Sequence, residues 1–214
     1  MTTNDTTTNE TSASIALPEV TAARASELYG QTQGAMVLVG AGLGWIISGL
    51  SALGEMPLGL FLAVLALAVL LLGGAVAVRR SAPGVTEAPW SPQTRRGFWL
   101  VFGGEGAAIV AIVAAALLLH SPGWILPLIA LAVGLHFLPL ARLFRRPLYY
   151  ITGAALCAVC AATIVFMPPQ WGVRHLQGWL FCAGLGSGTV LWLSAIGMLG
   201  QSGQGLRKFS RRRP

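Results

Sequence analysis

Charged residues are scarce in this chain. Asp, Glu, Lys and Arg together make up 10% of the 214 residues, whereas a soluble domain carries about 25%. Apolar residues reach 55%, and the mean hydropathy is +0.70. A chain of this length cannot hide so much apolar surface from water in a core of its own, so a soluble fold is excluded.

Acidic residues are scarcer than basic ones, and their shortage gives the chain a net charge of +7. A basic balance can indicate nucleic-acid binding. Here, however, nearly all of the Lys and Arg residues stand at the ends of apolar segments. That distribution is typical of topology signals in membrane proteins, so we expect no nucleic-acid partner.

Cysteine is also rare, and the three cysteines do not indicate a site. Cys157 and Cys160 form a CxxC pair inside an apolar segment, and Cys182 stands alone in another. A reactive thiol needs a reachable position and groups that stabilise the thiolate, and a zinc site needs more ligands than this stretch offers. We therefore interpret the cysteines as packing residues and predict no metal and no cofactor.

The N-terminal residues also lack Lys and Arg. Residues 1–14 contain Asp5 and Glu10 but neither Lys nor Arg, and the first apolar run begins only near Ala35. A secretory signal opens on a basic region that is followed at once by an apolar run. We expect the first apolar segment to remain in the mature protein.

What the chain does have is six long apolar segments. Each is close to the ~20 residues that a helix needs to cross a hydrocarbon core of ~30 Å, and a helix satisfies its own backbone hydrogen bonds there. The predicted fold is all-α, an integral membrane bundle of six transmembrane helices in three antiparallel hairpins. The segments are residues 35–54, 57–78, 98–119, 122–141, 148–167 and 178–200.

The basic residues predict the orientation of this bundle in the lipid bilayer. With six spans, all of the 14 Lys and Arg residues except Arg174 lie on the side that holds both termini. Because basic loops stay in the cytoplasm, we predict cytoplasmic termini and a location in the cell (plasma or inner) membrane. The predicted organisation is a cytoplasmic tail over residues 1–34, a transmembrane domain over 35–200 and a basic cytoplasmic tail over 201–214.

Three stretches outside the six segments carry their own signals. Pro18 suits the first position of a short interfacial helix and Gly30 its end, although a weakly ordered linker fits residues 18–30 equally well. Three prolines favour an extended loop over residues 79–97. Residues 168–177, with a Trp and an Arg, suit a segment that lies in the membrane interface.

Glu105 is the strongest candidate for a functional residue. It lies within a Gly-Gly-Glu-Gly run of the third apolar segment, where an ionised carboxylate is costly and often marks function. His136 lies at a similar depth on the fourth segment, and a tight turn makes the two segments antiparallel neighbours. Both are candidates for a ligand site or a proton relay. The sequence leaves open whether they face each other, a cavity or another subunit.

Small polar residues and glycines extend this set. Thr152 and Ser194 lie at a depth similar to that of Glu105 and are further candidates for the relay or ligand pocket. Glycines four residues apart let two helices approach closely. That spacing predicts helix-packing roles for Gly40, Gly44, Gly184 and Gly188.

Enzyme chemistry is the less favoured class. The stretch Gly186-Ser187-Gly188 is similar to the serine motif of intramembrane serine proteases, but Leu185 stands where those need glycine and no His follows Ser187. An enzyme acting on lipids would need the usual paired carboxylates or His clusters, which are lacking. We assign no catalytic residue.

Residues 133–144 (VGLHFLPLARLF), together with the Gly-Gly-Glu-Gly run around Glu105, resemble small multi-span bacterial membrane proteins of uncharacterised function. The resemblance covers the third to fifth segments. It implies the same architecture and carries no activity that can be transferred.

Two functions remain open for the Glu105–His136 pair. In the first, the protein is a small transporter or channel that can act as a homodimer or other homo-oligomer, and the pair responds to protons or a ligand. In the second, it is a structural or accessory protein that binds a membrane partner through small-residue helix faces, and the pair is a packing element that fixes helix pairing.

Overall fold

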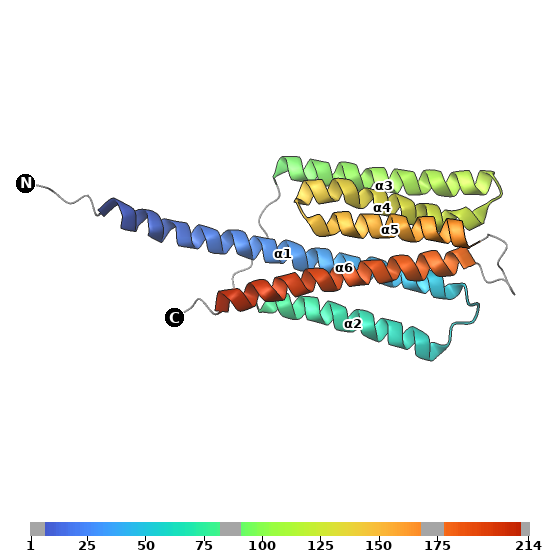
Figure 1. The fold of residues 1–214 in the computed structure, drawn as a ribbon, viewed down its shortest axis with the longest axis horizontal. Coiled ribbons are helices and arrows are strands. Elements are labelled where there is room, and N and C mark those ends of the chain that lie inside the picture. The colour runs from blue at the N-terminus through green and yellow to red at the C-terminus, as the bar shows by residue number, and fades with distance from the viewer. Residues whose placement is uncertain (1–6, 82–90, 168–177, 211–214) are drawn as a thin grey trace, which may run out of the picture.

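The computed structural model describes residues 7–81, 91–167 and 178–210, and side chains within 28–81, 91–167 and 178–204. In these ranges, six helices are long and apolar enough to cross a membrane, which confirms the predicted all-α class (Figure 1). The helices are α1 (Thr7–Ser51), α2 (Leu58–Arg80), α3 (Pro92–Leu118), α4 (Ile125–Phe144), α5 (Pro147–Phe166) and α6 (Gly178–Ser210), with a short 3₁₀ helix η1 (Pro122–Trp124) before α4.

The first and last helices form the centre of the bundle. α1 and α6 run antiparallel and make the most extensive helix contact of the structure (Figure 1). Val39 and Ile46 on α1 and Leu191 and Trp192 on α6 are buried in the core of this contact. The indole N–H of Trp192 donates a hydrogen bond to the carbonyl oxygen of Val39 at 3.0 Å. A polar bond therefore fixes the level at which the two helices pack.

The other helices are arranged around this pair. α4 and α5 form the second most extensive contact, and α6 touches both of them. α2 packs on α1 and α6, whereas α3 packs on α4 and η1. Helices that follow one another in sequence do touch, but the closest pairings join α1 to α6 and α4 to α5. The predicted arrangement in three hairpins is therefore not confirmed, although the two helices of each predicted hairpin are in contact.

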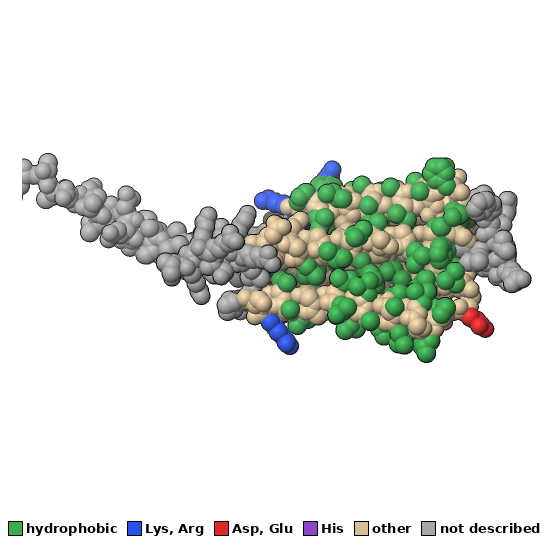
Figure 2. Space-filling model, turned by 60° about the horizontal axis from the view of Figure 1, so that its bottom comes forward, with side chains coloured by type: hydrophobic (Ala, Val, Ile, Leu, Met, Phe, Trp, Pro, Cys, Tyr) green, Lys and Arg blue, Asp and Glu red, His purple; other side chains and the backbone are tan. Residues whose placement is uncertain are grey.

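Apolar side chains cover the outside of the bundle. Figure 2 shows them spread over the visible face, with basic side chains at one end and an acidic one at the other. Leu70, Leu118 and Phe166 are 71%, 78% and 77% exposed. Continuous apolar surface of this kind is stable against lipid and not against water. These features make the chain a polytopic membrane protein.

Local capping explains where α3 begins. Ser91 is the N-cap residue, its hydroxyl oxygen accepts a hydrogen bond from the backbone N–H of Thr94 at 3.1 Å, and Pro92 occupies the first turn. Both features are typical of helix starts. The predicted loop over residues 79–97 was therefore too long at its end, since α3 already includes Arg95 and Arg96; its middle, residues 82–90, lies outside the described residues.

The next comparison concerns the chain around Gly30 and the end of α4. α1 continues through Gly30, where one of the two readings of residues 18–30 placed the end of a short helix. A single glycine costs only about 1 kcal/mol in a helix interior, and the apolar run that follows outweighs it. α4 ends at Phe144, and its C-cap residue Arg145 adopts the left-handed conformation with a φ of 52°. The predicted interfacial segment 168–177 lies outside the described residues.

The two ends of the bundle differ in charge. α1 begins and α6 ends at the same end (Figure 1), and the basic residues Arg79 and Arg80 close α2 there. The guanidinium carbon of Arg79 lies 4.4 Å from the centre of the Tyr29 ring, a cation–π contact between α2 and α1. That this end faces the cytoplasm stays a prediction from the basic residues.

Candidate functional site

Glu105 and His136 meet between α3 and α4. The carboxylate oxygen Oε2 of Glu105 lies 3.3 Å from Nδ1 of His136, and the side chains are 14% and 10% exposed. The short turn between the helices sets this register, because two antiparallel helices joined so closely bring residues at equal depth together. Glu105 therefore faces α4 of its own chain.

The contact is close but not fully bonded. Nδ1 of His136 has no hydrogen-bond partner of good geometry, although the carboxylate lies within ion-pair distance. The edges of Phe102 and Phe137 pack near the His136 ring, with ring centres 6.5 and 5.7 Å away. An imidazole and a carboxylate in this arrangement can hold one proton between them.

Thr152 and Ser194 form a second, separate polar pair. Their hydroxyl oxygens lie 2.8 Å apart between α5 and α6, and the residues are 1% and 8% exposed. α4 stands between the two pairs, because its His136 faces α3 while Gly134 and Phe137 pack against α5. The four candidates thus do not form the single pocket that their depths suggested.

The hydroxyl groups of Thr152 and Ser194 make more short contacts than they have protons to donate. Thr152 Oγ1 lies 2.9 Å from the carbonyl oxygen of Leu148, and Ser194 Oγ lies 2.8 Å from that of Val190. Together with the contact between the hydroxyls, three short contacts share two O–H groups. Each hydroxyl donates one proton only, so one of the three contacts lacks a proton at any instant.

The glycines divide between a buried and an exposed set. Gly184 and Gly188 of α6 pack against α1, and a Cβ on Gly184 would lie 2.8 Å from the backbone oxygen of Trp45. Gly40 and Gly44 face outward, with no atom within 4 Å of an added Cβ. Among the described residues, nothing packs against Gly40 and Gly44, so their predicted packing role stays a prediction.

Gly42 and Gly49 take that packing role on α1. A Cβ on Gly42 would lie 2.7 Å from Nε1 of Trp192, and one on Gly49 would lie 2.7 Å from the backbone nitrogen of Leu185. Gly42 and Gly49 are separated by about two helical turns, so they lie on the same face of α1. This spacing is the signal that the sequence offers for the pair. The four-residue spacing on α1 thus marks its outward face, whereas Gly42 and Gly49 make the contact with α6.

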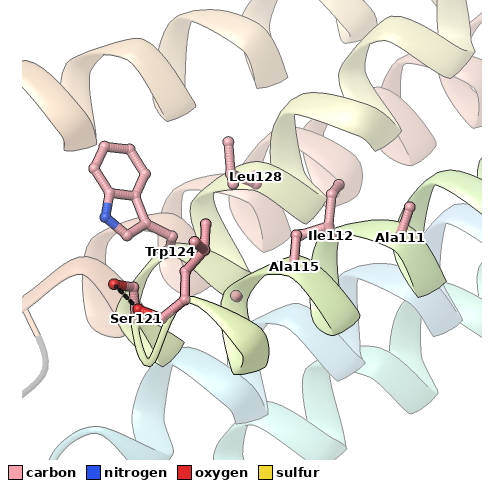
Figure 3. A pocket seen from close by; sticks show the side chains of 8 residues that line it. Ala111, Ile112, Ala115, Ser121, Trp124 and Leu128 are labelled. Atoms are coloured by element: carbon pink, nitrogen blue, oxygen red, sulfur yellow. Dashed lines mark hydrogen bonds between the residues drawn. The ribbon is translucent and has the colours of Figure 1, made fainter.

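A hollow lies further along the α3–α4 contact, toward the turn that joins the helices (Figure 3). It has a volume of about 450 Å³, and its lining includes Ala111, Ala115 and Trp124. Neither Glu105 nor His136 lines it. The polar pair and the hollow are therefore two distinct features of the same helix contact.

The cysteines of α5 lie in the helix packing. Cys160 is buried, and its thiol donates a hydrogen bond to the backbone oxygen of Pro127 at 3.0 Å. Cys157 is half-buried, and a Cβ on Gly134 of α4 would lie 2.8 Å from its sulfur. Across the residues that the structure describes, no three His, Cys, Asp or Glu side chains gather where they could hold a metal ion.

Comparisons with known proteins add no assignment to this geometry: no protein-family model, no curated protein and no solved structure matches the chain.

Proposed function

We propose that the protein is a small transporter or channel in which the Glu105–His136 pair binds and releases protons. The proposal rests on the 3.3 Å distance between the carboxylate of Glu105 and the imidazole of His136. The two residues lie on helices that are long and apolar enough to cross a membrane. Ionisable side chains are costly in that environment and usually belong to an ion or proton path.

The packing of α3 supports a movable site. α3 packs only on α4 and η1 among the described elements, and Ala116 is its single buried residue among those described. Gly103, Gly104 and Gly106 have no atom within 4 Å of an added Cβ, so no neighbouring group packs against α3 at these three glycines. A shift of α3 would change the Glu105–His136 distance without disturbing the α1–α6 core.

Proton flux into vesicles tests this proposal. The purified protein is reconstituted into liposomes that contain a pH-sensitive dye, and an imposed pH gradient is followed with potassium and valinomycin clamping the potential. We expect the wild type to dissipate the gradient faster than empty liposomes, and Glu105→Gln to abolish the difference because it cannot ionise. Glu55→Gln is the matched control, since Glu55 is exposed in the turn after α1. Equal flux in the wild type and Glu105→Gln would refute the proposal.

A second function rests on the outward face of α1. Gly40 and Gly44 are exposed there, and the hydroxyl of Ser48 donates to the backbone oxygen of Gly44 at 2.8 Å, so it needs no partner outside the helix. The exposed faces of α2 and α3, by contrast, carry long aliphatic and aromatic side chains. Glycines four residues apart on an open face allow a second helix to approach closely. The alternative is thus an accessory protein that assembles through α1, with the Glu105–His136 pair holding α3 on α4.

Disulfide cross-linking distinguishes this alternative when the partner is a second copy of the chain. Ala41→Cys, placed beside the two exposed glycines in a variant without native cysteines, is expected to form a cross-linked dimer in membranes. Leu70→Cys on the exposed face of α2 is the matched control and is expected to stay monomeric. A monomer in both variants would argue against self-association through α1.

A further inference from the structure

The hollow between α3 and α4 is formed by small residues. Ala111 and Ala115 on α3 leave space beside Ile112, and Leu128 of α4 forms the opposite wall (Figure 3). The volume of about 450 Å³ lies within the range of about 300–1,000 Å³ that small-molecule sites occupy. A hollow of this size does not remain empty, because its lining would lose dispersion contacts.

Water is a poor occupant of this hollow. Ser121 supplies the one hydroxyl of its lining, and that hydroxyl donates to the carbonyl oxygen of Leu119 at 3.1 Å. A stable buried water needs two to four polar partners. The remaining lining consists of aliphatic side chains and the ring of Trp124, so the chemistry of the hollow selects hydrocarbon.

The hollow opens to the side of the bundle that faces lipid. Leu117, Leu118 and Leu119 around its end are 60%, 78% and 74% exposed, and α2, α5 and α6 do not cover α3 in the described structure. From Ala111 to Leu119 the helix rises by about 12 Å. One leaflet of the hydrocarbon core is about 15 Å thick, so the hollow follows most of the length of an acyl chain.

A tryptophan pair marks the level of the lipid head groups. Trp124 is 39% exposed, and its ring packs edge-on against Trp179 of α6 with centres 4.6 Å apart. Tryptophan gathers at the boundary between hydrocarbon and head groups. We propose that the hollow between α3 and α4 binds one acyl chain of a membrane lipid, whose head group lies beside Trp124. This site is separate from the Glu105–His136 pair and does not depend on the function proposed for it.

Native mass spectrometry tests the site by counting retained lipid. The protein is reconstituted with phosphatidylcholine and phosphatidylglycerol, extracted with detergent and washed. We expect one lipid to stay bound to the wild type. Ala111→Leu with Ala115→Leu fills the hollow, and retention is expected to fall about tenfold or more, which corresponds to about 1.4 kcal/mol of binding free energy. Ala114→Leu, exposed on the same turn of α3 and outside the lining, is expected to retain the lipid. Equal retention in the filled variant would overturn the proposal.

A photoreactive lipid tests the same site in the unaltered chain. Phosphatidylcholine with a diazirine in one acyl chain is irradiated in vesicles with the wild-type protein, and the labelled peptides are identified. Labels concentrated on residues 111–128 are expected. Labels spread evenly over the exposed faces of α2 and α3 would overturn the proposal, because they would indicate ordinary contact with bulk lipid.

Discussion

A methyl group on Gly49 tests the central helix contact directly. A Cβ at this position would lie 2.7 Å from the backbone nitrogen of Leu185 and 3.0 Å from the carbonyl carbon of Gly184. Both atoms belong to the backbone of α6, so no side chain can rotate away to relieve the contact. Gly49→Ala therefore requires α1 and α6 to separate, and every side chain packed between them loses part of its contact.

The size of the effect follows from two opposing contributions. Overpacking of a tight contact costs about 1–3 kcal/mol, whereas replacing glycine by alanine in a helix gains up to about 1 kcal/mol. Gly44 lies on the same helix with no atom within 4 Å of an added Cβ, so Gly44→Ala carries the gain without the clash. The free energy of unfolding of Gly49→Ala should thus lie about 1–3 kcal/mol below that of Gly44→Ala.

Reversible unfolding in mixed micelles, at increasing fractions of a denaturing detergent, measures this difference. Size-exclusion chromatography should first establish that both variants are monomeric, so that contacts between chains do not enter the comparison. A difference smaller than about 0.5 kcal/mol, the usual error of additivity, would refute the α1–α6 contact described above. A difference of the expected sign would place the two helix backbones in contact at Gly49.

The same unfolding experiment also tests two hydrogen bonds between helices. In a double-mutant cycle, Thr152→Val and Ser194→Ala should couple by about 0.6 kcal/mol, the average for hydrogen bonds between membrane helices; additive single effects would contradict the hydroxyl contact at 2.8 Å. Trp192→Phe removes the indole N–H that donates to Val39 and should lower the free energy of unfolding by about 0.5–1.5 kcal/mol, and an unchanged value would show that this bond contributes nothing.

The sequence was sufficient for the six spans and for the similar depth of Glu105 and His136, but not for the contact between their side chains. Apolar runs of membrane length admit few structures other than helices that cross the bilayer, so the six spans follow from length and composition. The common level of Glu105 and His136 follows from a short turn, which fixes both the direction and the register of α3 and α4. Depth does not set the direction in which each side chain points around its helix, so only the structure shows that the two face each other.

The pairing of α1 with α6 was not predictable in the same way. In lipid, an apolar side chain gains little by facing another helix instead of a hydrocarbon tail, so hydrophobicity does not mark the packing face. Gly40 and Gly44 have the familiar spacing, yet Gly42 and Gly49 make the contact. Which glycines are covered depends on the shape of the opposite helix, in particular on where Trp192 projects.

The contact between α1 and α6 also sets a condition on how the protein is made. α1 ends at Ser51 and α6 begins at Gly178, so translation at about 5–20 residues per second separates their emergence from the ribosome by roughly 6–25 s. During that interval Gly42 and Gly49 of α1 do not yet have α6 to pack against. The nascent protein must therefore hold its first helix in the membrane, shielded by lipid or by the insertion machinery, until the last helix arrives and closes the core.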